Sequence, residues 1–302
     1  MTSVGAELRS CVVCGGALHT ALRKDEFALV SCGTCGMLMR ARLPARDELE
    51  EIYAPEYFEY SPEHPVDGYA DYLGDAERHR EAARRRLSLI DQLAPSRGRL
   101  LDVGAAAGFF VDEANRAGWE AEGIDIAPHV VEWGRQQLNI PLRVGELSAV
   151  EERGAFTVVT MWDYIEHSLD PAGELARSNE LLAGDGLVAL STGDLDSAAA
   201  RLSRSHWHLL TPRHHNFFFS ARTLVRLLER SGFEVTWLGH PGSRYSLAHL
   251  AYKLDRGVRT AMTGAAARRI ASSRFGRFSL PLNLFDIVTV VARKVRQPPV
   301  VQ

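Results

Sequence analysis

From residue 99 onward, short continuous runs of apolar residues alternate with segments whose apolar residues recur at helical spacing. The continuous runs predict seven strands, at 99–104, 119–126, 142–145, 156–162, 186–192, 233–239 and 285–294. The intervening segments predict helices at 109–118, 129–139, 173–184 and 220–232. Buried strands that alternate with amphipathic helices are typical of an α/β fold, in which helices cover both faces of a mostly parallel sheet. The last strand follows an unusual connection, so it can run antiparallel beside its neighbour.

Two further segments accompany this α/β region. Residues 45–97 are expected to form a helical linker or lid, because Leu87, Ile90 and Leu93 share one helical face. Residues 240–282 are too long for a tight connection between the last two strands, and their apolar and arginine residues predict a helical insertion. Such an insertion could hold a substrate diphosphate or rest on a membrane surface.

Composition places the chain among ordinary soluble globular proteins. Of its 302 residues, 46% are hydrophobic and 24% are charged. The N-terminus has no apolar signal-peptide core and no apolar run could span a bilayer, so we expect a cytoplasmic protein without a transmembrane segment. The net charge of −3 is uneven, because residues 251–302 carry ten Lys or Arg against two acids, or +8, which leaves −11 for the rest. The acidic body argues against DNA and RNA as partners, whereas the basic end permits one anionic partner.

All four cysteines lie near the N-terminus in two C-x2-C pairs. Cys11 and Cys14 form the first pair, Cys32 and Cys35 form the second, and a glycine follows each pair. Each pair can point two thiolates at one ion, so together they predict a closed Zn²⁺ site in a zinc ribbon at 1–44. Disulfides are disfavoured in the cytosol, and a redox C-x2-C needs a thioredoxin-like βαβ unit that is absent. The zinc is therefore expected to be structural rather than catalytic.

The first strand of the α/β region runs into the sequence DVGAAAG, from Asp102 to Gly108. Gly104 and Gly108 allow a sharp turn close to a ligand, and small residues such as Ala105 keep the loop open. The loop lacks the dinucleotide pattern G-x-G-x-x-G, so hydride transfer from NAD is disfavoured. A carboxylate at Asp102 is unhelpful beside a pyrophosphate, but it suits a ligand that carries positive charge.

Two more acids follow the next strands. Asp125 ends the second strand, 21 residues after Gly104, where a carboxylate can accept hydrogen bonds from both ribose hydroxyls. Glu146 follows the third strand, near where an adenine amino group would lie. Together, the loop and the two acids predict a nucleoside-type ligand at these strand ends.

The sequences DVGAAAG, GIDI, VGE and MWDYIEH resemble the motifs of class I S-adenosylmethionine-dependent methyltransferases over about residues 98–292. The resemblance implies a Rossmann-like, seven-stranded, mostly parallel sheet in a methyltransferase domain at 98–302. It also implies that the first three motifs hold the methionine, ribose and adenine parts of S-adenosylmethionine, with Ala106 in place of the usual middle glycine. The cofactor-binding residues that it implies are Asp102, Gly104, Ala105, Gly108, Asp125, Ile126, Glu146, Trp162 and Asp163.

A zinc ribbon before such a domain is similar to the sugar C-methyltransferases of deoxysugar biosynthesis, although we expect this protein to lack their large third domain. In PRHHNFFFS, His215 matches that family's proposed base, while His214 and Pro212 replace its Glu and Tyr. His167 of YIEHSLDP matches a second family histidine. The resemblance implies His-assisted C- or O-methylation of a small-molecule acceptor. We expect a nucleotide- or lipid-linked sugar, or another intermediate of natural-product biosynthesis.

The histidine-rich stretch also permits a metal site. Its four histidines, with Asp163 and Glu166, could serve metal-dependent O-methylation. Adjacent His214 and His215 point apart, which makes four imidazoles on one ion awkward. His206, Trp207 and His208 are expected to pack, and the phenylalanines after His215 to form core and pocket wall.

Two other classes of function stay open. In a nucleic-acid methyltransferase the zinc ribbon would contact RNA, but no Asn-Pro-Pro-aromatic tetrad follows the fourth strand. The fold could also serve as a non-catalytic binding scaffold. Tyr53, Tyr57 and Tyr60 precede the sheet and are expected to form a lid or to be buried.

Overall fold

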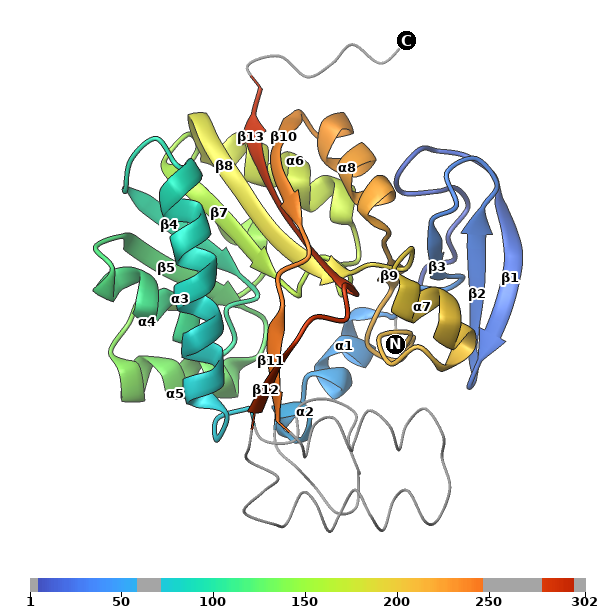
Figure 1. The fold of residues 1–302 in the computed structure, drawn as a ribbon, viewed down its shortest axis with the longest axis horizontal. Helices are drawn as coiled ribbons and strands as arrows, with labels where there is room; N and C mark the ends of the chain where they lie inside the picture. Colours follow the sequence, from blue (N-terminus) through green and yellow to red (C-terminus); the bar gives the residue numbers. More distant parts are fainter. Residues whose placement is uncertain (1–4, 59–71, 247–278, 296–302) are drawn as a thin grey trace.

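The computed structural model describes residues 5–58, 72–246 and 279–295 (Figure 1). Within these ranges a large mixed sheet and a small antiparallel sheet lie side by side. Among the described helices, none has the length and hydrophobicity needed to cross a bilayer. The expected lid residue Tyr60 and the basic residues between 247 and 278 lie outside the described ranges.

The large sheet has seven strands in the order β10-β13-β8-β7-β4-β5-β6. Their bounds are β4 Arg99–Val103, β5 Glu120–Asp125, β6 Leu142–Val144, β7 Phe156–Trp162, β8 Leu182–Gly193, β10 Phe233–Gly239 and β13 Ile287–Lys294. β4 to β8 pair in parallel, whereas β13 lies antiparallel between β8 and β10. The predicted seven-stranded, mostly parallel sheet is confirmed, including a reversed last strand.

Helices cover both faces of this sheet because alternate strand residues point to opposite sides. One face packs against α3 (Ala76–Leu93), α4 (Phe109–Arg116) and α5 (Pro128–Leu138) through side chains such as Leu100 and Val158. The other face packs against α6 (Pro171–Leu181) and α8 (Ala221–Arg230) through the neighbouring Leu101 and Val159.

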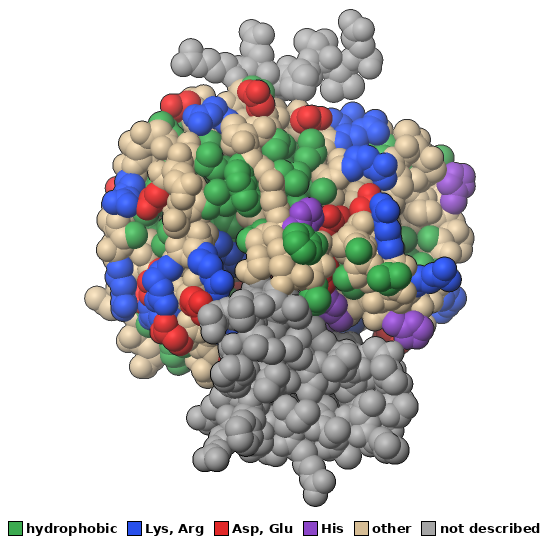
Figure 2. All heavy atoms as spheres, in the orientation of Figure 1, with side chains coloured by type: hydrophobic (Ala, Val, Ile, Leu, Met, Phe, Trp, Pro, Cys, Tyr) green, Lys and Arg blue, Asp and Glu red, His purple; other side chains and the backbone are tan. Residues whose placement is uncertain are grey.

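The surface of α3 is a mixture of acidic and basic side chains. Arg84 pairs with Glu77, and Arg85 pairs with Glu81. Figure 2 shows Lys and Arg interspersed with Asp and Glu on this side of the molecule. This face therefore offers no large patch of one charge.

Two predicted boundaries shift for local reasons. The helix expected at 173–184 begins at Pro171, because the Asp170 side chain accepts a hydrogen bond from Gly173 N at 2.9 Å and caps it. The strand that follows begins at Leu182 and includes residues that we expected to be helical.

The small sheet combines the N-terminal segment that carries the four cysteines (residues 5–44, called the cysteine ribbon below) with a strand from far along the chain. Its order is β1-β2-β3-β9, with β1 Leu18–Lys24, β2 Phe27–Cys32, β3 Leu38–Arg40 and β9 Phe217–Phe218. Met37, Met39 and Phe217 are fully buried in the same core as the strands of the large sheet. The ribbon is therefore joined to the α/β domain by both hydrogen bonds and apolar packing.

The remaining elements surround the carboxyl end of the large sheet. They are α1 Arg46–Ile52, α2 Pro55–Phe58, η1 Leu147–Ala149, α7 Ala198–Ser203, η2 Arg204–His206, β11 Ser243–Ser246 and β12 Ser279–Leu282. The helical linker predicted before the sheet appears as α1, α2 and α3. At the described ends of the expected helical insertion, β11 and β12 form an antiparallel pair instead. The residues between them lie outside the described ranges.

Phe217→Ala should destabilise the protein by about 3–5 kcal/mol, the usual cost of truncating a fully buried phenylalanine. Its ring lies in the core where the ribbon meets the large sheet. Urea unfolding measures the change, with Leu202→Ala as a control because Leu202 is 85% exposed. Equal effects of the two substitutions would contradict a shared core.

Candidate active site

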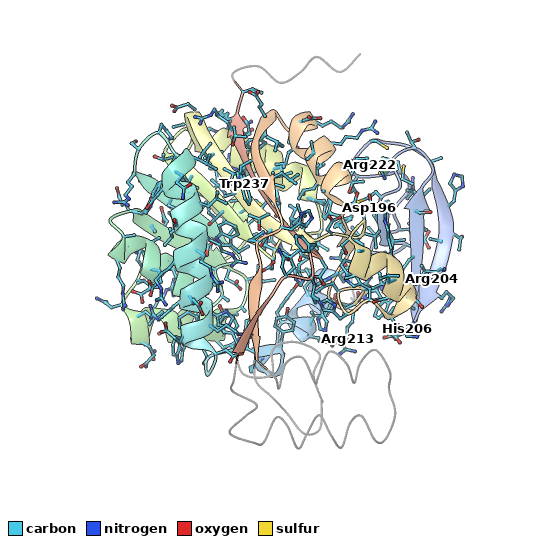
Figure 3. All side chains as sticks on the ribbon, in the orientation of Figure 1. Asp196, Arg204, His206, Arg213, Arg222 and Trp237 are labelled. Carbon is cyan, nitrogen blue, oxygen red and sulfur yellow. The ribbon has the colours of Figure 1, made fainter. Side chains whose placement is uncertain are left out.

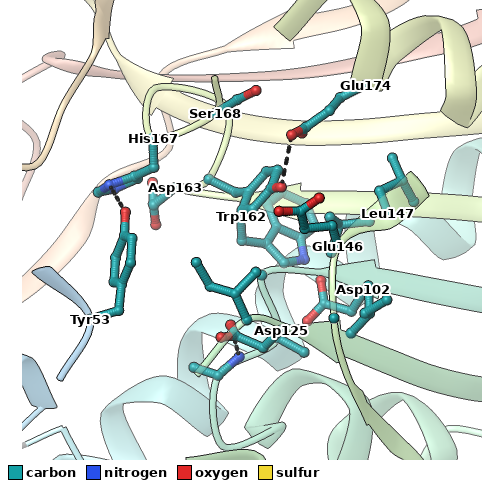
Figure 4. Close-up of a pocket in the computed structure, with 18 of the residues that line it drawn as sticks. Tyr53, Asp102, Asp125, Glu146, Leu147, Trp162, Asp163, His167, Ser168 and Glu174 are labelled. Atoms are coloured by element: carbon teal, nitrogen blue, oxygen red, sulfur yellow. Dashed lines mark hydrogen bonds between the residues drawn. The ribbon is translucent and has the colours of Figure 1, made fainter. Parts of the chain in front are cut away.

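A cavity of about 620 Å³ opens at the carboxyl ends of β4, β5 and β7. Figure 4 shows its acids on successive strand ends and Tyr53 with His167 at one side. Predicted site residues that line it are Asp102, Gly104, Ala105, Asp125, Ile126, Glu146, Trp162, Asp163 and His167. Among the described lining residues, Gly108, His214 and His215 do not appear. One cavity thus collects most of the residues implied for the cofactor, together with one of the three histidines.

The loop after β4 needs residues that tolerate positive φ. Gly104 has φ +73°, and a Cβ there would lie 2.4 Å from Cδ2 of Tyr164. Gly108, with φ +79°, precedes α4, and a Cβ there would lie 2.5 Å from Ile140 Cδ1. Ala106 also has positive φ, at +47°. Gly104 therefore shapes the cavity wall, whereas Gly108 lets the loop pack against the β6 side of the domain.

Asp125 is fixed between two backbone segments. Its Oδ2 accepts a hydrogen bond from Ala106 N at 2.8 Å, and its Oδ1 accepts one from Ala127 N at 2.9 Å. Burial nevertheless raises the pKa of this carboxyl. The carboxylate is held rigidly at the end of β5, where hydroxyl donors of a ligand could meet its remaining lone pairs.

Asp102 is 3% exposed and accepts a hydrogen bond from Thr160 Oγ1 at 2.6 Å. Burial raises the pKa of Asp102 to about 7, so this carboxyl is only partly ionised near neutral pH. A positive charge bound in the cavity would favour the ionised form.

Glu146 pairs with Arg46, a residue that no sequence motif distinguishes. Arg46 of α1 donates to Glu146 Oε1 at 2.5 Å, and their side chains are 73% and 45% exposed. The pair brings the first helix of the linker to the rim of the cavity.

Asp163 has φ +52°, an uncommon backbone conformation for a residue other than glycine. Its backbone N–H donates to Ser191 O at 3.0 Å. Arg86 of α3 donates to Asp163 Oδ2 at 2.8 Å, and its guanidinium lies 4.6 Å from the Trp162 ring centroid. Arg86 is thus a second cavity residue that the sequence did not reveal.

His167 and His215 lie edge to face, with ring centroids 4.7 Å apart. His167 Nδ1 is 3.0 Å from His214 O and 2.9 Å from the Tyr53 hydroxyl, and His215 Nδ1 is 2.9 Å from Leu209 O. Because a carbonyl only accepts, both Nδ1 atoms carry protons and both Nε2 atoms keep a lone pair. Burial lowers the pKa of His167 well below its usual value and that of His215 to about 4, so both rings are neutral.

Glu166 lies next to this histidine pair. Ligand atoms of Glu166, His167 and His215 lie within 4.8 Å of one another. Oε2 of Glu166 is buried without a hydrogen-bond partner among the described residues. Burial raises the pKa of Glu166 to about 8. This set could bind a divalent cation, and it differs from the four-histidine set that the sequence suggested.

The rest of the histidine-rich stretch divides between core and surface. Trp207 is 2% exposed, as expected. His208 Nε2 lies 3.4 Å from Asp286 Oδ2. The expectation that His206 packs is wrong: it is exposed, and Figure 3 shows it at the periphery near Arg204. His214 lies against Tyr57, with ring centroids 5.2 Å apart.

The four cysteines converge on one point. Cys11 Sγ is 3.5 Å from Cys35 Sγ, and Cys14 Sγ is 3.4 Å from Cys32 Sγ. Burial opposes ionisation of Cys32, but the backbone N–H groups of Cys35 and Thr34 lower its pKa to about 6. A tetrahedral zinc with Zn–S of 2.3 Å needs S···S separations of about 3.8 Å, so the thiols are close to that arrangement.

Comparison with known proteins gives a consistent picture. A family described as "Methyltransferase domain" matches residues 75–238. The chain is 28% identical over 157 residues to the ubiquinone biosynthesis O-methyltransferase of Xanthomonas axonopodis pv. citri (strain 306), covering 48% of this chain and 66% of that enzyme. It therefore spans about two thirds of this relative, and 53% of a second enzyme of the same name.

Two solved structures show the same fold. A candidate methyltransferase from Bacillus halodurans C-125 has a TM-score of 0.51 and 16% identity, covering 69% of this chain and 98% of its own. A chain in the complex of the Haloferax volcanii Trm112 methyltransferase activator with a candidate methyltransferase has a TM-score of 0.53 and 14% identity. That match covers 84% of this chain and 99% of the other. At these identities the likeness concerns the fold alone.

We expect Asp102→Asn to become more stable relative to the wild type as pH rises. Because the Asp102 pKa is raised from 3.8 to about 7, folding holds a proton that the unfolded chain releases, and this stabilisation is lost as pH rises through the folded pKa. The amide carries no such proton, so the difference in free energy of unfolding should change by about 3 kcal/mol between pH 5 and 8. Urea unfolding of the unliganded proteins measures it. A difference independent of pH would show that Asp102 has an ordinary pKa.

Proposed function

Because the chain belongs to the methyltransferase-domain family, we propose that it transfers a methyl group from S-adenosylmethionine to a hydroxyl group of a small-molecule acceptor. The observation that carries the proposal is one cavity in which Asp102, Asp125 and Glu146 lie at strand ends and which His167 also lines. A nucleoside donor and a proton acceptor can therefore share one enclosed space.

The carboxylates suit the donor. Bound S-adenosylmethionine supplies a methyl group already activated on a sulfonium. Asp125 would accept hydrogen bonds from the ribose hydroxyls, and Asp102 would face the positively charged methionine end. Glu146 would lie toward the adenine, beside its partner Arg46. Ionisation of Asp102 on binding a cation would strengthen that contact.

His167 suits the acceptor side. Its Nδ1 proton is directed to His214 O, so its Nε2 lone pair is the one able to take a proton from an acceptor hydroxyl. Tyr53 helps to hold the ring, and His215 lies behind it. We therefore assign proton removal to His167 and a supporting role to His215, the reverse of the order that the sequence favoured.

The relatives favour oxygen as the acceptor atom, since they are named O-methyltransferases. A sugar or natural-product hydroxyl, free or linked to a nucleotide or lipid, is the acceptor class we propose. Tyr53 and Tyr57 line the cavity and can supply an apolar wall for a ring.

His167→Ala should lower kcat by about 100-fold or more, the usual contribution of a general base, while S-adenosylmethionine affinity stays nearly unchanged. His215→Ala should lower kcat less, and His206→Ala, an exposed control, should not change it. S-adenosylhomocysteine release over a panel of hydroxylated acceptors measures turnover, and calorimetry measures donor binding. Failure to bind the donor would exclude methyl transfer, and turnover only with RNA would favour the nucleic-acid alternative.

One observation favours a metal-dependent version of the reaction. Glu166, His167 and His215 offer a carboxylate and two imidazole lone pairs, a donor set that suits a divalent cation. Such a cation would supply charge to stabilise the acceptor oxygen as it loses its proton. In that case His215→Ala and His167→Ala would be equally damaging, and chelation would abolish turnover.

We also propose that the four cysteines hold a structural zinc. Four thiolates close the coordination sphere, so the ion would stabilise the ribbon and take no part in the reaction.

Elemental analysis should find one zinc per chain, and Cys14→Ser should remove it and lower the thermal midpoint. Thr34→Ala is the matched control, because the hydrogen bond from Thr34 to Cys32 Sγ is donated by its backbone N–H, which the substitution keeps. A second equivalent of metal that survives in Cys14→Ser would indicate occupation of the Glu166 site. Absence of metal from the wild type would contradict the zinc proposal.

A further inference from the structure

Asn216 lies between the cysteine ribbon and the histidine side of the cavity. Asn216 is 1% exposed, and both ends of its side-chain amide have partners. Nδ2 donates to His167 O at 2.9 Å and to Ser168 O at 3.1 Å, while Oδ1 faces Arg40 Nη1 at 3.4 Å. A buried amide with both ends bonded fixes the segments that it joins.

On the ribbon side, Asn216 continues the pairing of β9 with β3. Leu38 pairs with Phe218, Met39 pairs with Phe217, and Arg40 N donates to Asn216 O at 2.9 Å. β3 follows the second cysteine pair directly, and Cys32 N donates to Met37 O at 2.9 Å. The order of β3 therefore depends on the cysteine turn that precedes it.

On the cavity side, Asn216 holds the loop that carries the predicted base. Asn216 N donates to Glu166 O at 2.8 Å, in addition to the two side-chain bonds to the carbonyls of His167 and Ser168. His215 is its immediate neighbour in the chain. Both histidines of the acceptor side are thus tied to one asparagine.

The donor side has separate supports. Asp102 is held by Thr160 of β7, and Asp125 is held by backbone N–H groups of the loops that follow β4 and β5. None of these bonds involves the ribbon or Asn216. Loosening Asn216 should therefore affect the two halves of the cavity differently.

We propose that Asn216 is a positioning residue through which the cysteine ribbon holds His167 and His215 in place on the acceptor side. The expected effect of Asn216 on turnover rests on the proposed function, whereas its expected effect on the order of the histidine loop does not. Asn216 thereby gives the ribbon a role in the reaction without any contact between the ribbon and the substrate.

The test compares Asn216→Ala with Asn179→Ala. Asn179 makes a similar amide bridge, to Ser231 O and Gly232 O, and does not line the cavity. Hydrogen exchange followed by mass spectrometry should show amides of 163–168 exchanging about tenfold faster in Asn216→Ala, as expected for lost buried hydrogen bonds. Exchange in 102–110 and the affinity for S-adenosylhomocysteine should stay at wild-type values.

Turnover provides the second readout. Asn216→Ala should lower kcat about tenfold with little change in KM for the donor, whereas Asn179→Ala should leave both unchanged. Asn216→Leu keeps a similar volume and should show the same selectivity if the alanine variant does not fold. Wild-type exchange rates at 163–168 in a folded Asn216 variant would overturn the inference.

The ribbon is tested separately through Cys35→Ser. If the ribbon acts through Asn216, Cys35→Ser should raise the hydrogen-exchange rates of amides in 163–168 and 213–219 while leaving those in 102–110 at the wild-type level. Loss of protection in all three segments together, or none at 163–168, would overturn the ribbon's role. Hydrogen exchange is measured without an acceptor substrate. If the wild type transferred no methyl group, the proposed function would be contradicted, but the exchange rates would still test the role of Asn216.

Discussion

The parallel arrangement of β4, β5 and β7 is the constraint on which the cavity depends. Parallel neighbours end at the same edge, so Asp102, Asp125 and Asp163 meet there although many residues separate them in sequence. β4 and β7 carry apolar side chains on both faces, because α3, α4 and α5 cover one side of the sheet and α6 and α8 cover the other. The burial that stabilises the sheet also encloses the acids.

Features with a local signal could be predicted from the sequence. Continuous apolar runs identified all seven strands, and the glycine turn with Asp125 identified the donor end of the cavity. Arg46 and Arg86 were missed because either could equally have been a solvated charge on a helix face. Their contacts with Glu146 and Asp163 exist only once the helices are docked on the sheet. Helical periodicity shows which residues share a face, but not which charged residue lies over a cavity.

The relation between the two histidines also depends on distant packing. Sequence similarity favoured His215, yet His167 lines the cavity and His215 lies behind it. Residues 217 and 218, which follow His215 closely in the chain, form β9 and pair with β3 of the ribbon. A two-residue strand has no detectable periodicity, so neither β9 nor its partner could be inferred from the sequence.

Buried acids give the cavity a definite preference for positive charge. Asp102 and Glu174 line the cavity, and burial raises the pKa of each to about 7. Glu166 is not among the lining residues but lies beside His167, which is, and burial raises its pKa to about 8. Arg86 pairs with Asp163 and lies over the Trp162 ring. From there its positive charge offsets part of the negative charge of Asp102 and Glu166. Binding an anion here would leave the acids without compensation, whereas a sulfonium or a divalent cation would allow them to ionise. The same burial keeps His167 and His215 neutral, and a neutral imidazole can accept a proton or bind a metal. The electrostatics thus favour a cationic donor beside a neutral base, and they do so independently of any similarity to known enzymes.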